Sequence, residues 1–235
     1  DRRQRQMCIR DSMDTKPQYF SDLVRIAGLA HGTDVWLGNA QTLIKEGKAT
    51  ISTAICTRDD IMIYLIQKGL DSEESFKIME MVRKGKVASG KCKEWPEWKQ
   101  DMIDHGVPDW YIWSCERIKY MFPKAHAAAY VMMAWRVAYC KVFYPLAYYT
   151  AYFSIRATAF DYEKMAMSPV RLEHYIAEYK AKKAEGTISN TEEDELGVMR
   201  IVQEMHARGY EFTPIDIYKA KARTFQIIDG KIMPS

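Results

Sequence analysis

The sequence has little glycine and proline, and its cysteines form no recognisable pattern. It contains 12 glycines and 8 prolines in 235 residues, which favours helices over a loop-rich β-sandwich. The five cysteines are scattered, form no CxxC pair and predict free thiols in a reducing compartment. No apolar run approaches the roughly 18–20 residues of a membrane span, and no segment has the pattern of a signal peptide. These absences argue against a membrane protein and against a disulfide-rich secreted domain.

Several catalytic motifs are also missing. The sequence contains no GxxxxGK(S/T), GxGxxG, GxSxG or HExxH motif. Cys92, His105 and Cys115 do not have a usual zinc-ligand spacing, so we expect no metal there. The adjacent Asp59 and Asp60 lie at a predicted helix start, where their side chains diverge; they favour helix capping over a two-metal centre. A self-contained enzyme is therefore disfavoured.

Positive charge is concentrated in residues 116–156. This segment has six basic residues and one acidic residue, a net charge of +5, whereas the whole chain carries +3. It is also the most aromatic part of the sequence. A local basic patch predicts a polyanionic partner such as phosphate or nucleic acid, and the alternative is a solvated helix face.

The spacing of apolar residues predicts a mainly α-helical chain with a small β-hairpin near its C-terminal end. The hairpin is expected over residues 224–233, around Asp229 and Gly230. The helix over 126–144 is apolar on nearly all sides, which predicts that it is the most enclosed element. Residues 87–109 have the composition of a polar connector. The other predicted helices span residues 20–27, 39–44, 61–68, 73–84, 109–120, 146–157, 169–185 and 191–208.

The first twelve residues, DRRQRQMCIRDS, differ from the rest of the chain. They have no apolar period, and their second half resembles the translated end of a sequencing adapter. We therefore predict that residues 1–12 are a non-native scar without function, with a native basic tail as the alternative. The sequence does not end in a polar segment, so we expect that it is truncated at its C-terminal end.

Long blocks of the sequence are similar to one known family. Residues 120–130 read YMFPKAHAAAY, and related blocks begin at His31 (HGTDVWLGNAQ), Arg58 (RDDIM), Lys77 (KIMEMVRKGK) and Ile227 (IIDG). In this order the blocks closely resemble the fingers of PolC-type DNA polymerase III, the C-family replicase of low-GC Gram-positive bacteria. The resemblance covers residues 13–235.

The resemblance implies a fingers fragment of a DNA-directed DNA polymerase. In that family the fingers bind the incoming deoxynucleoside triphosphate and close over the nascent base pair, while palm aspartates outside this sequence hold two Mg²⁺ ions. Residues 13–157 would form the nucleotide-facing fingers core, and 158–235 peripheral helices with the hairpin. The fragment would be inactive alone. Expected partners are primer–template DNA, the remaining polymerase chain (palm, thumb and C-terminal DNA-binding region) and, through absent regions, the sliding clamp, in the bacterial cytoplasm at the nucleoid.

The predicted nucleotide-binding residues surround one helix start. Lys124 and His126 lie in its first turn, where free backbone N–H groups and the helix dipole favour phosphate, and Tyr130 follows one turn later. The resemblance adds four cations and places residues near the base-pair pocket. The added cations are Arg58, Arg83, Lys84 and Lys86, and the residues near the pocket are His31, Gly32, Thr33 and Asp34.

Several of these residues also have a structural interpretation. Arg83, Lys84 and Lys86 would be favoured at a helix C-terminus without any ligand, and Arg58 could simply pair with Asp59. His126 could be an interior histidine. For the tyrosines at 148, 149 and 152, core packing is the preferred reading. At the level of the whole chain, the alternative function is a non-enzymatic helical module that binds nucleic acid through residues 116–156.

Overall fold

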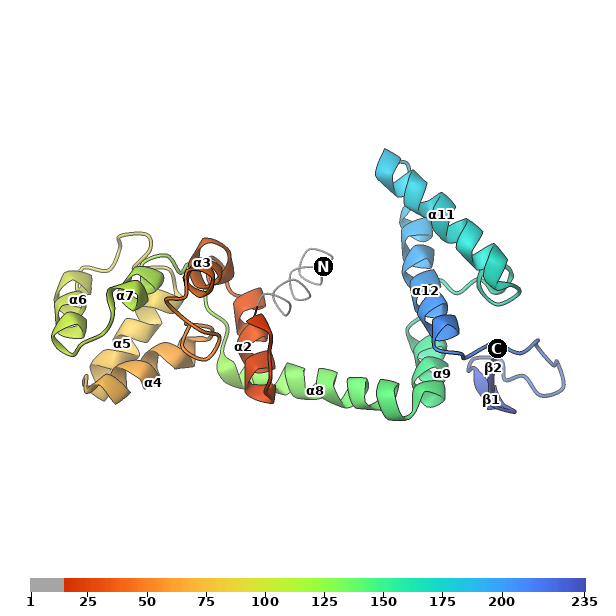
Figure 1. The fold of residues 1–235 in the computed structure, drawn as a ribbon, viewed down its shortest axis with the longest axis horizontal. Coiled ribbons are helices and arrows are strands. Elements are labelled where there is room, and N and C mark those ends of the chain that lie inside the picture. Colours follow the sequence, from red (N-terminus) through yellow and green to blue (C-terminus); the bar gives the residue numbers. More distant parts are fainter. Residues whose placement is uncertain (1–14) are drawn as a thin grey trace. The chain divides into compact units, whose positions relative to one another are not determined.

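The computed structural model describes residues 15–235 and is mainly α-helical with one small antiparallel sheet, which confirms the predicted fold class (Figure 1). The chain forms two compact units, one extending to Ala134 and the other running from Trp135 to Ser235. The expected division after residue 157 remains a prediction. The proposed scar at residues 1–12 lies outside the described residues. Each unit is described separately below.

The first unit is a helical domain built around a continuous apolar core. Large buried side chains come from most of its elements, among them Trp36, Ile61, Ile78 and Tyr111. Its elements are α2 (Phe20–His31), a kinked turn (Trp36–Ala40), α3 (Gln41–Lys45), α4 (Arg58–Lys68), α5 (Ser72–Arg83), α6 (Trp95–Asp104) and α7 (Asp109–Cys115). In Figure 1, α4 and α5 lie side by side.

Side-chain caps fix where the central helices begin. Thr57 is the N-cap residue of α4, and the Asp60 carboxylate accepts the backbone N–H of Thr57 at 2.8 Å. Asp71 caps α5 by accepting the backbone N–H groups of Glu73 and Glu74 at 2.9 and 3.1 Å. Such caps satisfy amides that have no partner inside the helix. The predicted capping role of Asp60 is confirmed.

The prediction of a connector over residues 87–109 is wrong. This segment contains α6, whose Met102 is fully buried, and Trp95 and Trp98 pack against the core. Lys99 and the Trp95 indole N–H both donate to the Glu116 carboxylate, at 2.8 and 3.1 Å. The charged residues are the solvent face of an amphipathic helix, which composition alone did not reveal.

The prediction that the apolar helix is the most enclosed element is also wrong. Helix α8 (Lys124–Phe143) begins in the first unit and ends in the second, and Ala127 is its only buried residue. Tyr130 and Met133 are 63% and 64% exposed. An apolar helix is buried only when other elements cover it, and residues 15–235 do not supply that cover.

The second unit contains a helical pair and the predicted hairpin. After α9 (Pro145–Ile155) and the short α10 (Tyr162–Met165), helices α11 (Pro169–Glu185) and α12 (Asn190–Ala207) pack against one another. Strands β1 (Gln226–Ile228) and β2 (Lys231–Met233) pair antiparallel, with Ile227 opposite Ile232. Tyr149 is fully buried in this unit's core, and Tyr148 and Tyr152 pack against it. The predicted core packing of these three tyrosines is therefore confirmed. No helix among the described residues could span a membrane.

Candidate functional site

Residues 119–122 join three distant parts of the first unit by backbone hydrogen bonds. Thr33 donates its N–H to the carbonyl of Tyr120 at 2.9 Å, and Met121 donates to the carbonyl of Arg83 at 3.3 Å. Arg58 donates to the carbonyl of Phe122, also at 3.3 Å. This strand-like segment leads directly into α8. The structure therefore brings the four predicted blocks, at 31–34, 58–60, 83–86 and 124–130, to one place.

Gly85 allows one of these approaches, that of the C-terminus of α5 to residues 119–122. It has φ +67°, and a Cβ atom built on it would lie 2.6 Å from the carbonyl oxygen of Lys119. A side chain would therefore meet backbone as well as an unfavourable backbone conformation. Gly85 thus sets how closely the C-terminus of α5 approaches the segment that leads into α8.

The start of α8 is held by the two aspartates at the start of α4. The Asp59 carboxylate accepts the backbone N–H of Lys124 at 2.8 Å, and the Lys124 ammonium lies 3.5 Å from the Asp60 carboxylate. This corrects one detail of the prediction, because the first N–H group of the helix is occupied. The backbone N–H groups of Ala125 and His126 have no partner among residues 15–235 and remain available.

Four rings form a continuous column beside this helix start. The ring centroids of His31 and Phe122 are 5.1 Å apart, those of Phe122 and His126 are 5.0 Å apart, and those of His126 and Tyr130 are 4.7 Å apart. His126 and His31 are exposed, so His126 is not an interior histidine. The column presents aromatic surface, suited to stacking against a base or packing against a sugar.

The cations at the C-terminus of α5 differ in how they are held. Glu80 binds both Arg83 and Lys84, with 2.9 Å to the Arg83 Nη2 and 2.8 Å to the Lys84 Nζ. The hydrogen bond from Arg83 lowers the pKa of Glu80 to about 2. Lys86 is exposed and has no carboxylate partner among the described residues. Lys86 is thus the least restrained of the three.

Arg58 and Asp34 differ in whether their charged groups have partners. The Arg58 Nε is buried without a hydrogen-bond partner among the described residues, and no ion pair joins Arg58 to Asp59 there. The simple pairing considered from the sequence is therefore not observed. Asp34 has φ +58° and pairs with the Lys119 ammonium at 2.7 Å. A buried donor without an acceptor is unusual, and an external acceptor could satisfy it.

Sequence reasoning overlooked three contributors to this site. Phe122 connects His31 to His126, Glu80 restrains two of the predicted cations, and Lys119 pairs with Asp34. The four-residue spacing of Phe122, His126 and Tyr130 was a signal for a shared helical face, although Phe122 precedes the helix itself. The contacts of Glu80 with Arg83 and Lys84 also follow helical spacing.

The site does not fit a divalent metal. No group of three histidine, cysteine, aspartate or glutamate side chains in residues 15–235 could hold an ion. The only acidic pair here, Asp59 and Asp60, is committed to two helix caps and to Lys124. The Mg²⁺ ions that the resemblance assigns to the palm thus have no ligand set in the described part of the chain.

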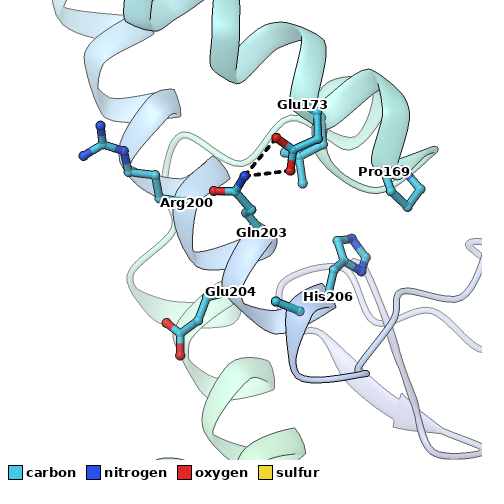
Figure 2. Close-up of a pocket in the computed structure, with 8 residues that line it drawn as sticks. Pro169, Glu173, Arg200, Gln203, Glu204 and His206 are labelled. Carbon is cyan, nitrogen blue, oxygen red and sulfur yellow. Dashed lines mark hydrogen bonds between the residues drawn. The ribbon is translucent and has the colours of Figure 1, made fainter.

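A shallow pocket in the second unit involves none of the predicted site residues. Figure 2 shows the Gln203 amide facing the Glu173 carboxylate, to which it donates at 2.7 and 2.9 Å. Glu204 instead binds Lys141 at 2.8 Å and Tyr149 at 3.1 Å. The Glu173, Gln203 and Glu204 side chains are therefore paired within the unit, and this arrangement points to a structural role for these three residues.

Comparisons with known proteins identify the family. Residues 2–106 match the family model described as the bacterial DNA polymerase III alpha subunit finger domain. The class is thus that of bacterial replicative polymerase fingers.

The match to full-length relatives is longer. Over 94% of its length the chain is 52% identical to a PolC-type DNA polymerase III of Streptococcus suis, of which it covers 15%. It is 51% identical to the corresponding protein of Bacillus subtilis over 92% of the chain, and 48% identical to that of Caldanaerobacter subterraneus over 98%. The chain belongs to the PolC-type DNA polymerase III family and represents a segment of its finger region. The alternative of an independent nucleic-acid-binding module is not favoured.

Proposed function

We propose that the start of α8 forms the triphosphate-binding surface of the fingers in a PolC-type replicative DNA polymerase. One observation carries the proposal: residues 119–122, just before the block that begins at Lys124, form hydrogen bonds to three parts of the chain that are distant in sequence. Their meeting brings cations, free helix amides and an aromatic column together on one unit. The cations and the free amides favour phosphate binding, and the aromatic column favours packing against a nucleotide sugar or base.

Each residue has a distinct role in this proposal. Lys124 contributes a point charge beside the free amides of Ala125 and His126, and Tyr130 packs on the nucleotide. Arg83, Lys84 and Lys86 flank the same segment and add positive charge, and the unpartnered Arg58 Nε donates to an acceptor outside the described residues. His31–Asp34 lies against the nascent base pair. Phosphoryl transfer depends on positioning and charge stabilisation, both of which such a surface supplies.

The complete polymerase supplies the remaining chemistry. The catalytic aspartates and their Mg²⁺ ions belong to the palm, and the chain alone does not polymerise DNA. Primer–template DNA is the second substrate, and the sliding clamp is contacted through other regions. The setting is the bacterial cytoplasm, at the nucleoid. These statements rest on what the family resemblance implies; the relatives, of which this chain spans about 15%, support the polymerase assignment itself.

The test is single-nucleotide incorporation by a complete polymerase that carries Lys124→Ala. Loss of one preorganised charge should reduce the efficiency of nucleotide use by about 2–4 kcal/mol, or roughly 30- to 1,000-fold. Affinity for primer–template, measured separately, should change little. Lys77→Ala is the matched control, because Lys77 pairs with Glu73 on an exposed face of α5. Unchanged incorporation with weakened DNA binding would assign Lys124 to the DNA backbone instead.

A further inference from the structure

In the second unit, α9 turns away from the end of α8 (Figure 1). An apolar groove of about 700 Å³ lies at this turn. Its walls come from the last turns of α8 and from one face of α9. Ile155 and Tyr144 on these walls are 73% and 60% exposed. The remaining lining residues are Arg136, Val137, Cys140, Ala147, Tyr148, Ala151, Tyr152 and Arg156. Exposed apolar surface of this extent marks an interaction site.

The composition of the groove identifies the kind of partner. Its lining combines tyrosines and aliphatic side chains with two arginines and contains no lysine, aspartate or glutamate. This is the composition found at the centres of protein–protein interfaces. A nucleic-acid surface depends instead on many phosphate contacts, and two cations on an apolar groove do not provide them.

The two arginines add a charge requirement. Neither Arg136 nor Arg156 has a carboxylate partner among the described residues. The nearby Lys141 is already bound to Glu204 at 2.8 Å. Residues 135–160 contain three basic and no acidic residues, so no local carboxylate can approach the groove from this stretch. The missing partner must therefore bring apolar side chains together with carboxylates.

We infer that this groove is covered by another segment of the same polymerase polypeptide, which presents an apolar face flanked by carboxylates to Arg136 and Arg156. The chain covers about 15% of its full-length relatives, so most of the polypeptide lies outside it. The inference rests on the proposed function only in placing this chain inside a complete polymerase. It explains why the apolar end of α8 is uncovered in the second unit.

Cys140 provides a direct reporter because its exposed thiol lines the groove. The other described cysteines, Cys56, Cys92 and Cys115, are buried, and burial raises their thiol pKa values. With Cys8→Ser in the background, maleimide labelling reports on Cys140. The 235-residue chain should label rapidly. A complete family polymerase in which this segment replaces its own should label at least about tenfold more slowly. Equal rates in the two proteins would overturn the inference.

Charge reversal tests the proposed carboxylates. In the complete polymerase, Arg156→Glu should raise the Cys140 labelling rate about tenfold or more, because it places like charges together. The matched control is Arg171→Glu, at an exposed arginine on α11 outside the groove, which should leave the rate unchanged. No response to Arg156→Glu, or equal responses to both variants, would contradict the charge assignment.

The same labelling assay distinguishes the proposed segment from other molecules that could cover the groove. Protection of the isolated chain that grows with protein concentration would identify a second copy, and protection by oligothymidylate would identify single-stranded nucleic acid; either overturns the inference. Protection in the complete polymerase should be the same with Lys124→Ala. A failure of the nucleotide-binding proposal therefore affects incorporation, whereas a failure of this inference affects Cys140 labelling.

Discussion

The Asp59 carboxylate accepts the backbone N–H of Lys124 at 2.8 Å, although the two residues are 65 positions apart. The neighbouring Asp60 caps the helix on which both acids lie, through the backbone N–H of Thr57. Two adjacent carboxylates thus fix the starts of two helices, α4 and α8. Because α8 begins with the predicted phosphate-binding residues, the acid pair acts as a scaffold for that surface.

Removing this cap should weaken both the fold and the site. Asp59→Ala should lower the free energy of unfolding of the chain by about 1 kcal/mol, the usual cost of losing a cap. This corresponds to a fall in Tm of roughly 2–4 °C at this chain length. In a complete polymerase, the same variant should reduce nucleotide incorporation, because the first turn of α8 loses its anchor.

Asp71→Ala is the matched control, since Asp71 caps α5 at an exposed position away from α8. It should cost similar stability, measured by thermal unfolding, and leave incorporation unchanged. If both variants impaired incorporation equally, the effect would reflect stability, and the scaffold role of Asp59 would be lost.

Gly85 should tolerate no side chain, for two separable reasons. In Gly85→Ala the left-handed backbone costs about 1–2 kcal/mol, and the new Cβ meets the Lys119 carbonyl oxygen. Gly90 has the same backbone conformation, with φ +68°, and open space around it. Gly90→Ala should therefore show the backbone cost alone. Denaturant unfolding of both variants measures the difference, and equal losses would mean that the close approach to Lys119 contributes nothing.

Periodicity predicted the outer helices and the hairpin accurately. The helix expected over 169–185 is α11, and the Asp229–Gly230 turn joins β1 to β2. These elements form from local signals, namely a proline in the first turn, a glycine at the end, and a tight-turn dipeptide. The helix expected over 191–208 begins one residue earlier, at Asn190, because Ser189 forms the capping box with Glu192.

The burial of α8 and the identity of α6 were not predictable in the same way. Apolar character shows that α8 needs a cover but does not say which residues provide it. Within the candidate site, the meeting of Thr33, Arg58 and Arg83 depends on backbone hydrogen bonds to residues 119–122, which leave no periodic trace. The resemblance predicted that these residues belong to one site, whereas only the three-dimensional structure showed that Glu80 restrains Arg83 and Lys84.

The Glu80 ion pairs should make stability depend on acid pH. The pKa of Glu80 falls from an ordinary 4.5 to about 2 because Arg83 and Lys84 hold the charged form. A lowered folded-state pKa stabilises the fold above the ordinary value, and this contribution disappears as pH falls through the folded pKa. The stability difference between the native chain and Glu80→Gln should thus shrink between about pH 5 and pH 2.

Chemical unfolding of both proteins over this range provides the measurement. Glu73→Gln removes a carboxylate from the same helix at the exposed pair with Lys77, and it controls for the change in net charge. A difference between native and Glu80→Gln chains that stays constant with pH would show that Glu80 gains no stabilisation from its two cations.

The final prediction concerns the coupling between Arg83 and Lys124. The Arg83 carbonyl accepts the N–H of Met121, three residues before Lys124, so the two cations are joined through one short segment. If both bind one triphosphate, Arg83→Ala should also reduce incorporation, and the double variant should lose less than the sum of the single losses. Single-nucleotide kinetics of the four proteins in the cycle give the coupling energy. The pair Lys77→Ala with Lys124→Ala should be additive, because Lys77 is bound to Glu73. Strict additivity for Arg83 and Lys124 as well would mean that they act on separate groups, and Arg83 would then be a structural partner of Glu80 alone.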